Sequence, residues 1–156
     1  MLNKLFPRKA SSKPSEPIFP ENNFGILQLE VDSSLAIASI NTAYNQYSNK
    51  KFFPWCAQVL FEILDKNENG HPTNEEAEVL NELEDKVEAF LKENHVVHFI
   101  GRLTRNGFRD IFYYLDKPNF DQNKTKIFFD EISAIRAVNF YLDEDSKWDK
   151  VAEFIE

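Results

Sequence analysis

The stretch from Leu60 to Leu91 constrains the fold most, because it leads from a strand-like segment through a polar loop into a clearly bounded helix. Apolar residues recur at three- and four-residue steps between Leu80 and Leu91, which is the stripe of an amphipathic helix. Thr73 is suited to the N-cap position, and Glu76 fits the acidic position of a capping box three residues later. The preceding segment, residues 55–64, has the alternating apolar pattern of a strand. We therefore expect a strand, a loop and a helix.

The rest of the chain predicts a fold of the α+β class. Asn106-Gly107 separates two β-rich runs and is the typical sequence of a two-residue hairpin turn. From Trp55 onward the expected order is β-α-β-β-α-β, which is a ferredoxin-like antiparallel sheet with both long helices on one face. An N-terminal β-hairpin over residues 24–41 is expected to widen this sheet. The later elements are expected as strands over 95–104 and 108–115, a helix over 121–132, a strand over 135–142 and a short C-terminal helix capped by Asp145.

Composition divides the chain into two parts and limits its partners. Residues 1–23 are basic and rich in proline and serine, so we expect a flexible arm followed by a single domain over residues 24–156. The formal net charge is −8, so binding to nucleic acid or to an anionic membrane is not expected. The single cysteine cannot form an internal disulfide, and no signal or membrane-spanning segment is expected. We expect a cytoplasmic protein, whose oligomeric state the sequence leaves open.

One segment matches the template of a calcium-binding loop. Asp65, Asn67, Asn69 and Glu76 occupy its ligand positions, with a glycine at the sixth place. Pro72 at the eighth place and a strand rather than a helix before the loop count against calcium. Calcium is therefore an alternative to a simple strand-to-helix loop, and no other cofactor is predicted.

Two surfaces are candidates for binding. The first is the sheet face opposite the helices, where we expect five residues to gather for a protein partner or for an anionic ligand held by two of the arginines; the five are Arg102, Arg109, Asp110, Tyr114 and Arg136. Cross-strand ion pairs that simply solvate the sheet are an equally good interpretation of the same residues. The second surface is the acidic helix, with Glu82, Glu84 and Glu88. No catalytic residues are predicted.

Several short patterns together resemble an uncharacterised bacterial family of domains of unknown function, related in fold to the regulator of ribonuclease activity B. They span about residues 55–148 and are Gly70-x-Pro72-Thr73-x-Glu75-Glu76, Glu84-Asp85, Gly101-Arg102, Gly107-x-Arg109, Tyr113 or Tyr114, and Asp145-x-x-Trp148. The resemblance implies a ferredoxin-like fold. Because the better-known relative binds a ribonuclease as a protein inhibitor, it also implies a binding role, without supplying catalytic residues or a target.

These observations favour a non-enzymatic binding or regulatory domain that acts through a protein partner. The alternatives are a small anionic-ligand or enzymatic site on the open sheet face and a calcium loop at residues 65–76.

Overall fold

A computed structural model describes residues 18–155, so most of the arm predicted over residues 1–23 lies outside the described residues. The described elements are β1 (Phe24–Val31), β2 (Ser34–Asn41), β3 (Trp55–Glu62), α1 (Asn74–Lys92), β4 (Val97–Arg105), β5 (Phe108–Leu115), α2 (Gln122–Ser133) and β6 (Val138–Glu144), with 3-10 turns at Thr42–Tyr44, Lys50–Phe52 and Asp149–Val151. None of the helices within residues 18–155 is long and apolar enough to cross a membrane.

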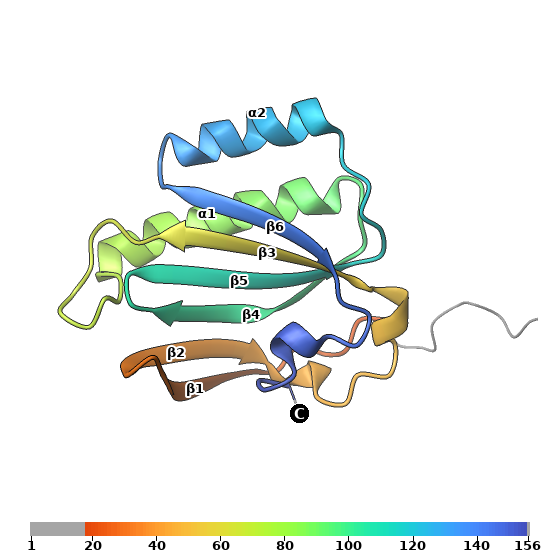
Figure 1. Ribbon diagram of the computed structural model, residues 1–156, viewed down its shortest axis with the longest axis horizontal. Coiled ribbons are helices and arrows are strands. Elements are labelled where there is room, and N and C mark those ends of the chain that lie inside the picture. The colour runs from red at the N-terminus through yellow and green to blue at the C-terminus, as the bar shows by residue number, and fades with distance from the viewer. Residues whose placement is uncertain (1–17, 156) are drawn as a thin grey trace, which may run out of the picture.

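The strands form one antiparallel sheet in the order β1-β2-β4-β5-β3-β6 (Figure 1). The α+β class, the antiparallel sheet and the two helices are confirmed. The hairpin β1–β2 extends the sheet beside β4, and β6 forms the opposite edge. Strand β6 begins three residues later than predicted, because the amides of Ile135 and Arg136 still donate to the carbonyl of Ile132 at the end of α2.

The first face of the sheet is covered by the two helices. Helix α1 buries the predicted stripe of Leu80, Leu83, Val87 and Leu91, and α2 adds Ile132 to the same cluster. Both helices therefore pack on one face of the sheet, with α2 lying beside edge strand β6 (Figure 1). Burial of this continuous apolar stripe supplies much of the driving force that holds α1 in place.

The second face is partly covered by the C-terminal segment. Trp148 is fully buried there; its indole N–H donates to the carbonyl of Phe53 at 2.9 Å, and its ring stacks on Tyr114. The predicted C-terminal helix starting at Asp145 is wrong. Trp148 has a left-handed backbone with φ 59°, which interrupts a regular helix, and only the 3-10 turn Asp149–Val151 follows. The Asp145 carboxylate nevertheless accepts hydrogen bonds from the amides of Asp149 and Lys150.

Candidate binding site

The two arginines predicted from the β4–β5 hairpin face α1 instead of the opposite side of the sheet. Arg102 Nη2 lies 2.9 Å from Glu84 Oε1, and Arg109 Nη1 lies 3.7 Å from Glu84 Oε2. In β4, an irregularity in pairing between Phe99 and Gly101 reverses the alternation of side chains, which turns Arg102 toward the helices. In β5, Arg109 and Asp110 are adjacent and so must face opposite sides. The prediction that these residues share one binding face is therefore wrong.

Glu84 consequently belongs to the interior and not to the acidic surface predicted on α1. Its side chain is buried between the helix and the sheet, and this burial raises its pKa even though Arg102 and Arg109 oppose the shift. Glu82 is exposed, and Glu88 is half-buried and pairs with Lys92 at 2.8 Å. The predicted acidic surface thus lacks Glu84, the member that lies between the other two in the sequence.

Arg136 also forms an ion pair with a carboxylate of α1. Its Nε donates to Glu76 Oε1 at 2.8 Å and its Nη2 donates to Glu76 Oε2 at 2.6 Å, while the amide of Leu64 donates to Glu76 Oε1 at 2.9 Å. The hydrogen bonds from Arg136 lower the pKa of Glu76. Glu76 therefore does not complete the predicted capping box with Thr73, although the Thr73 hydroxyl does cap the helix by accepting from the Glu76 amide at 3.3 Å. Nor do Arg102 and Arg136 converge on one anionic ligand, because each is paired with a different glutamate.

Two of the other three predicted calcium ligands, Asp65 and Asn67, have side-chain partners within the loop. Asp65 Oδ2 accepts a hydrogen bond from the Thr73 hydroxyl at 2.8 Å, and Asn67 Oδ1 accepts from the amides of Asn69 and His71 at 3.0 and 3.1 Å. Strand β3, not a helix, leads into this loop. Within residues 18–155 no group of three or more His, Cys, Asp or Glu side chains is arranged to hold a metal ion. Calcium binding stays an alternative to a simple strand-to-helix loop and is open to a direct test.

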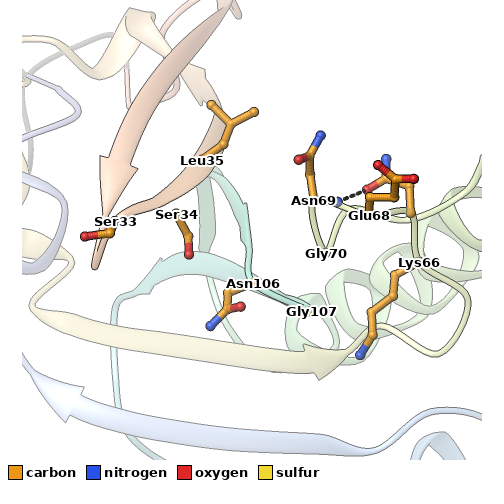
Figure 2. Close-up of a pocket in the computed structure, with 10 residues that line it drawn as sticks. Ser33, Ser34, Leu35, Lys66, Glu68, Asn69, Gly70, Asn106 and Gly107 are labelled. Carbon is orange, nitrogen blue, oxygen red and sulfur yellow. Dashed lines mark hydrogen bonds between the residues drawn. The ribbon is translucent and has the colours of Figure 1, made fainter.

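A polar hollow of about 440 Å³ lies where three turns meet, and we call it the turn hollow. Figure 2 shows Ser33, Ser34 and Leu35 from the β1–β2 hairpin on one side of it and the loop residues from Lys66 to Gly70 on the other, with Asn106 and Gly107 between them. The amide of Gly107 donates to the carbonyl of Gly70 at 2.9 Å, which fastens two of the turns together. None of the ten lining residues is a buried ionisable side chain, so the turn hollow offers only weak, solvated contacts to a ligand.

A second hollow adjoins the first on the part of the second sheet face that the C-terminal segment leaves uncovered. It has a volume of about 420 Å³, and we call it the sheet hollow; it is lined by Gln58, Leu60, Arg105, Asn106, Phe108, Asp110 and Tyr141. Strand pairing assembles it, since Leu60 lies opposite Asp110 and Gln58 lies opposite Tyr141. Asp110 and Tyr114 do share this face, but Trp148 stacks on Tyr114 and only Asp110 lines the hollow.

Asp110 is the distinctive group of the sheet hollow. It is only 5% exposed, and its Oδ1 accepts a hydrogen bond from Gln58 Nε2 at 2.8 Å. Among the described residues its carboxylate makes no ion pair within 4.0 Å. Burial raises the pKa of Asp110, while the Gln58 hydrogen bond and the charge of Arg105 oppose that shift. The sheet hollow therefore contains a desolvated carboxylate with unused hydrogen-bonding capacity.

The surroundings of Asp110 combine exposed aromatic rings with an excess of negative charge. Phe108 is 41% exposed and Tyr141 is 46% exposed. Arg105 forms an ion pair with Asp32, in which Arg105 Nη1 lies 3.6 Å from Asp32 Oδ2. The exposed Glu62 lies opposite Phe108 in the β3–β5 register. Such a site can hold a cationic group against the carboxylate and pack apolar atoms on the two rings.

The sequence predicted Asp110 as a site residue but did not predict its neighbours Arg105, Phe108 and Tyr141. Phe108 lies two residues before Asp110 on the same strand, so the alternation of side chains could have found it. Arg105 could not have been found, because the irregularity in β4 decides which way it points. Tyr141 required the pairing of β6 with β3, which joins segments more than 80 residues apart in the register Gln58–Tyr141.

Two residues with potential catalytic chemistry are buried elsewhere on this face. Burial raises the pKa of Cys56 to about 11 and lowers the pKa of His98 to about 4, so the thiol is protonated and the imidazole neutral at pH 7. His98 Nδ1 hydrogen-bonds with the Tyr44 hydroxyl at 2.7 Å inside an aromatic cluster. Neither side chain lines the sheet hollow, so neither can act on a ligand bound there.

The residues that carry the family resemblance serve mainly as structural contacts in the fold. They include the Glu84–Arg102 ion pair, the hydrogen bond from Tyr114 to Asp145 and the buried Trp148. A search of curated proteins gave no match, and neither did a search of solved structures. The model of a family of unknown function, DUF695, matches residues 22–155, which include the leading hairpin that the resemblance did not reach. The chain belongs to this family of unknown function, DUF695.

Proposed function

We propose that this protein is a non-enzymatic binding domain that acts through a protein partner, and that the partner contacts the uncovered part of the second sheet face. One observation carries the proposal: the exposed rings of Phe108 and Tyr141 flank a hollow around the buried carboxylate of Asp110. Aromatic side chains that surround a specific polar group are typical of the energetic centre of a protein interface.

The distribution of charge favours a protein partner over a small anionic ligand. Arg102, Arg109 and Arg136 are paired with glutamates of α1, on the side of the sheet away from the sheet hollow. Arg105 is the one arginine among the described residues that line the sheet hollow; it lies beside Asp32, and its charge also acts on Asp110. An anion bound there would have to approach an unpaired carboxylate, which is unfavourable.

Photo-crosslinking from Tyr141 tests the proposed surface. We would replace Tyr141 with p-benzoylphenylalanine, and in a matched control Ile127, which is 59% exposed on α2. The proposal expects a discrete protein adduct from position 141 in the native cytoplasm and none from position 127. The captured protein, once purified, should bind wild type and lose affinity about tenfold or more for Tyr141→Ala, as at an interface hot spot, but not for Ile127→Ala.

The acidic helix provides the competing surface. Glu82→Lys with Glu88→Lys reverses two carboxylates on α1 without touching the buried Glu84. If the purified partner binds this double variant as well as wild type, the helix face is excluded. If binding is lost there and kept in Tyr141→Ala, the partner docks on α1 and the assignment to the sheet face is wrong.

Three finer statements belong to the same proposal. We propose a ferredoxin-like arrangement for residues 55–144, supported by the order β4-β5-β3-β6 and by the two helices that connect strands which are not neighbours. We also propose a relation in fold to the regulator of ribonuclease activity B in a bacterial protein, supported by the short sequence patterns given above. A cytoplasmic location is proposed because the single cysteine cannot form an internal disulfide, which fits a reducing compartment.

A further inference from the structure

We propose that the sheet hollow accepts a single basic side chain, a lysine or an arginine of the partner, whose cationic head pairs with Asp110. This inference rests on the proposed function, because it specifies the chemistry of the partner at that site. An anionic ligand held by arginines was one alternative predicted from the sequence, and the ligand proposed here has the opposite charge.

The carboxylate of Asp110 is the first argument. An ionised carboxylate can accept about four hydrogen bonds, and within residues 18–155 the Asp110 carboxylate receives one, from the neutral amide of Gln58 at 2.8 Å. At 5% exposure, few water molecules can supply the others. A bound ammonium or guanidinium would provide charged donors where water is largely excluded, so the pair would be stronger than an ion pair on the open surface.

The walls of the sheet hollow are the second argument. Leu60, Phe108 and Tyr141 line it with apolar surface, and the two rings remain exposed. Lysine and arginine carry a three- or four-carbon stem before the charged group, so the stem can pack on these walls while the head reaches the carboxylate. The faces of the two rings also attract a cation. A short amine or a bare metal ion would use the carboxylate and leave the walls empty.

The neighbouring charges are the third argument. Among the described residues that line the hollow, Arg105 alone is cationic, and its guanidinium lies 3.6 Å from the exposed Asp32. Glu62 adds a further negative charge opposite Phe108. The field at the mouth of the sheet hollow therefore attracts a basic group, in keeping with the acidic character of the whole chain.

Short peptides test this site without knowledge of the partner. The probes are acetyl-Gly-Lys-Gly-amide and its arginine counterpart, with acetyl-Gly-norleucine-Gly-amide as the uncharged control of similar length. Binding would be followed by the amide chemical shifts of Phe108, Asp110 and Tyr141 in two-dimensional NMR. We expect saturable shifts with millimolar affinity for the basic peptides only, which is the strength of a single-residue contact.

Two variants make the test specific. Asp110→Asn keeps an oxygen that can accept from Gln58 and removes the charge, so it should weaken binding of the lysine peptide about tenfold or more. Glu82→Gln removes an exposed carboxylate of α1, on the other side of the sheet, and should leave the affinity unchanged, as expected for a distant and screened surface charge. Equal binding of the norleucine peptide, equal binding by Asp110→Asn, or no shifts up to the solubility limit would each overturn the inference.

The peptide and crosslinking experiments fail in different ways. If Tyr141 captures a partner whose affinity depends on Tyr141 while the peptides do not bind at Asp110, the proposed function stands and the basic-residue site is wrong. If the lysine peptide binds at Asp110 but no protein is captured from position 141, the proposed partner surface is wrong and so is the assignment of the basic group to a partner.

Discussion

Glu76 and Arg136 lie 60 residues apart in the sequence, and their side chains form a two-pronged ion pair with contacts of 2.8 and 2.6 Å. The Glu76 side chain is 1% exposed and that of Arg136 is 16% exposed, so the pair is largely shielded from water. The pair joins the first turn of α1 to the connection between α2 and β6. The amide of Leu64, just after β3, donates a hydrogen bond to the same carboxylate. The pair therefore connects three parts of the chain around one buried charge.

Removal of Arg136 should destabilise the protein strongly, because it leaves the Glu76 carboxylate buried without its cation. We expect Arg136→Ala to lower the free energy of unfolding by about 3 kcal/mol in urea titrations at pH 7. The double variant Glu76→Gln/Arg136→Ala should recover part of this loss, since it also removes the stranded charge. Lys126→Ala breaks an exposed pair with Asp130 and should cost less than about 0.5 kcal/mol. A value for Arg136→Ala as small as this control would show that the pair does not stabilise the fold.

Calcium should not stabilise the folded protein, because an ion in the loop would have to displace Arg136 from Glu76. Melting temperatures in millimolar calcium and in excess chelator should therefore coincide. A ligand that binds only the folded state raises the melting temperature by mass action, so this comparison is direct. A clear rise that Glu76→Gln abolishes would establish the calcium loop at residues 65–76.

The sequence was most informative where the decisive contacts are local. The cap at Thr73, the apolar stripe of α1 and the Asn106-Gly107 turn are each encoded within a few residues, and the structure has all three. The sidedness of β4 was not predictable in this way. One irregularity between Phe99 and Gly101 turns the Arg102 side chain to the other face of the sheet, and it lies where Gly101 pairs with Ile40 of β2, 61 residues earlier in the sequence.

The candidate site was harder to predict than the fold for the same reason. Asp110 was recognisable as a polar residue on a strand, but its burial depends on neighbours supplied by three other strands. The partner of Arg136 was equally hidden, because Glu76 already had a plausible local role in a capping box. The Glu76 side chain therefore forms a long-range ion pair with Arg136 and not the capping-box contact that the local sequence pattern predicts.

Gly101 allows β2 and β4 to pair closely, and replacing it should disrupt that pairing. A Cβ atom at this position would lie 2.4 Å from the Ser39 carbonyl oxygen and 3.0 Å from Ile40 Cα, and backbone atoms cannot easily move aside. We expect Gly101→Ala to cost about 2–3 kcal/mol, in the range of overpacked cores. Gly25→Ala is the matched control, since its nearest neighbour is the Thr42 methyl group at 3.3 Å.

Hydrogen exchange locates the effect of the Gly101 substitution. Amides of β2 should lose protection in Gly101→Ala while those of β3 and β5 keep most of theirs, because within residues 18–155 the hairpin β1–β2 pairs with the rest of the sheet only through β4. Uniform loss of protection across the sheet, or a stability equal to that of Gly25→Ala, would contradict this explanation.

Trp148 should be the main anchor of the C-terminal segment. We expect Trp148→Ala to cost about 3–5 kcal/mol, because it empties a fully buried site against Tyr114. Trp148→Phe keeps a ring but strands the Phe53 carbonyl, and should cost about 1–3 kcal/mol. Urea titration of both variants beside Trp55→Phe, which alters a half-buried tryptophan, provides the comparison. If Trp148→Ala is no worse than Trp55→Phe, the segment does not depend on this residue.

Removing the charge of Asp110 should stabilise the folded protein, as expected if the residue serves binding and not stability. Burial raises the pKa of the folded carboxyl above its unfolded value of about 3.9, so ionisation near pH 7 costs folding free energy. That cost disappears as the pH falls below the unfolded pKa, where the carboxyl is protonated in both states. Asp110→Asn should therefore unfold at a higher temperature than wild type at pH 7, by about 2–4 °C for each kcal/mol gained, and the difference should shrink toward pH 3.5. Glu62→Gln, at an exposed position on the same face, should show no comparable gain. If Asp110→Asn is less stable than wild type at pH 7, the ionised carboxylate has a stabilising partner and is not available to a basic side chain from outside.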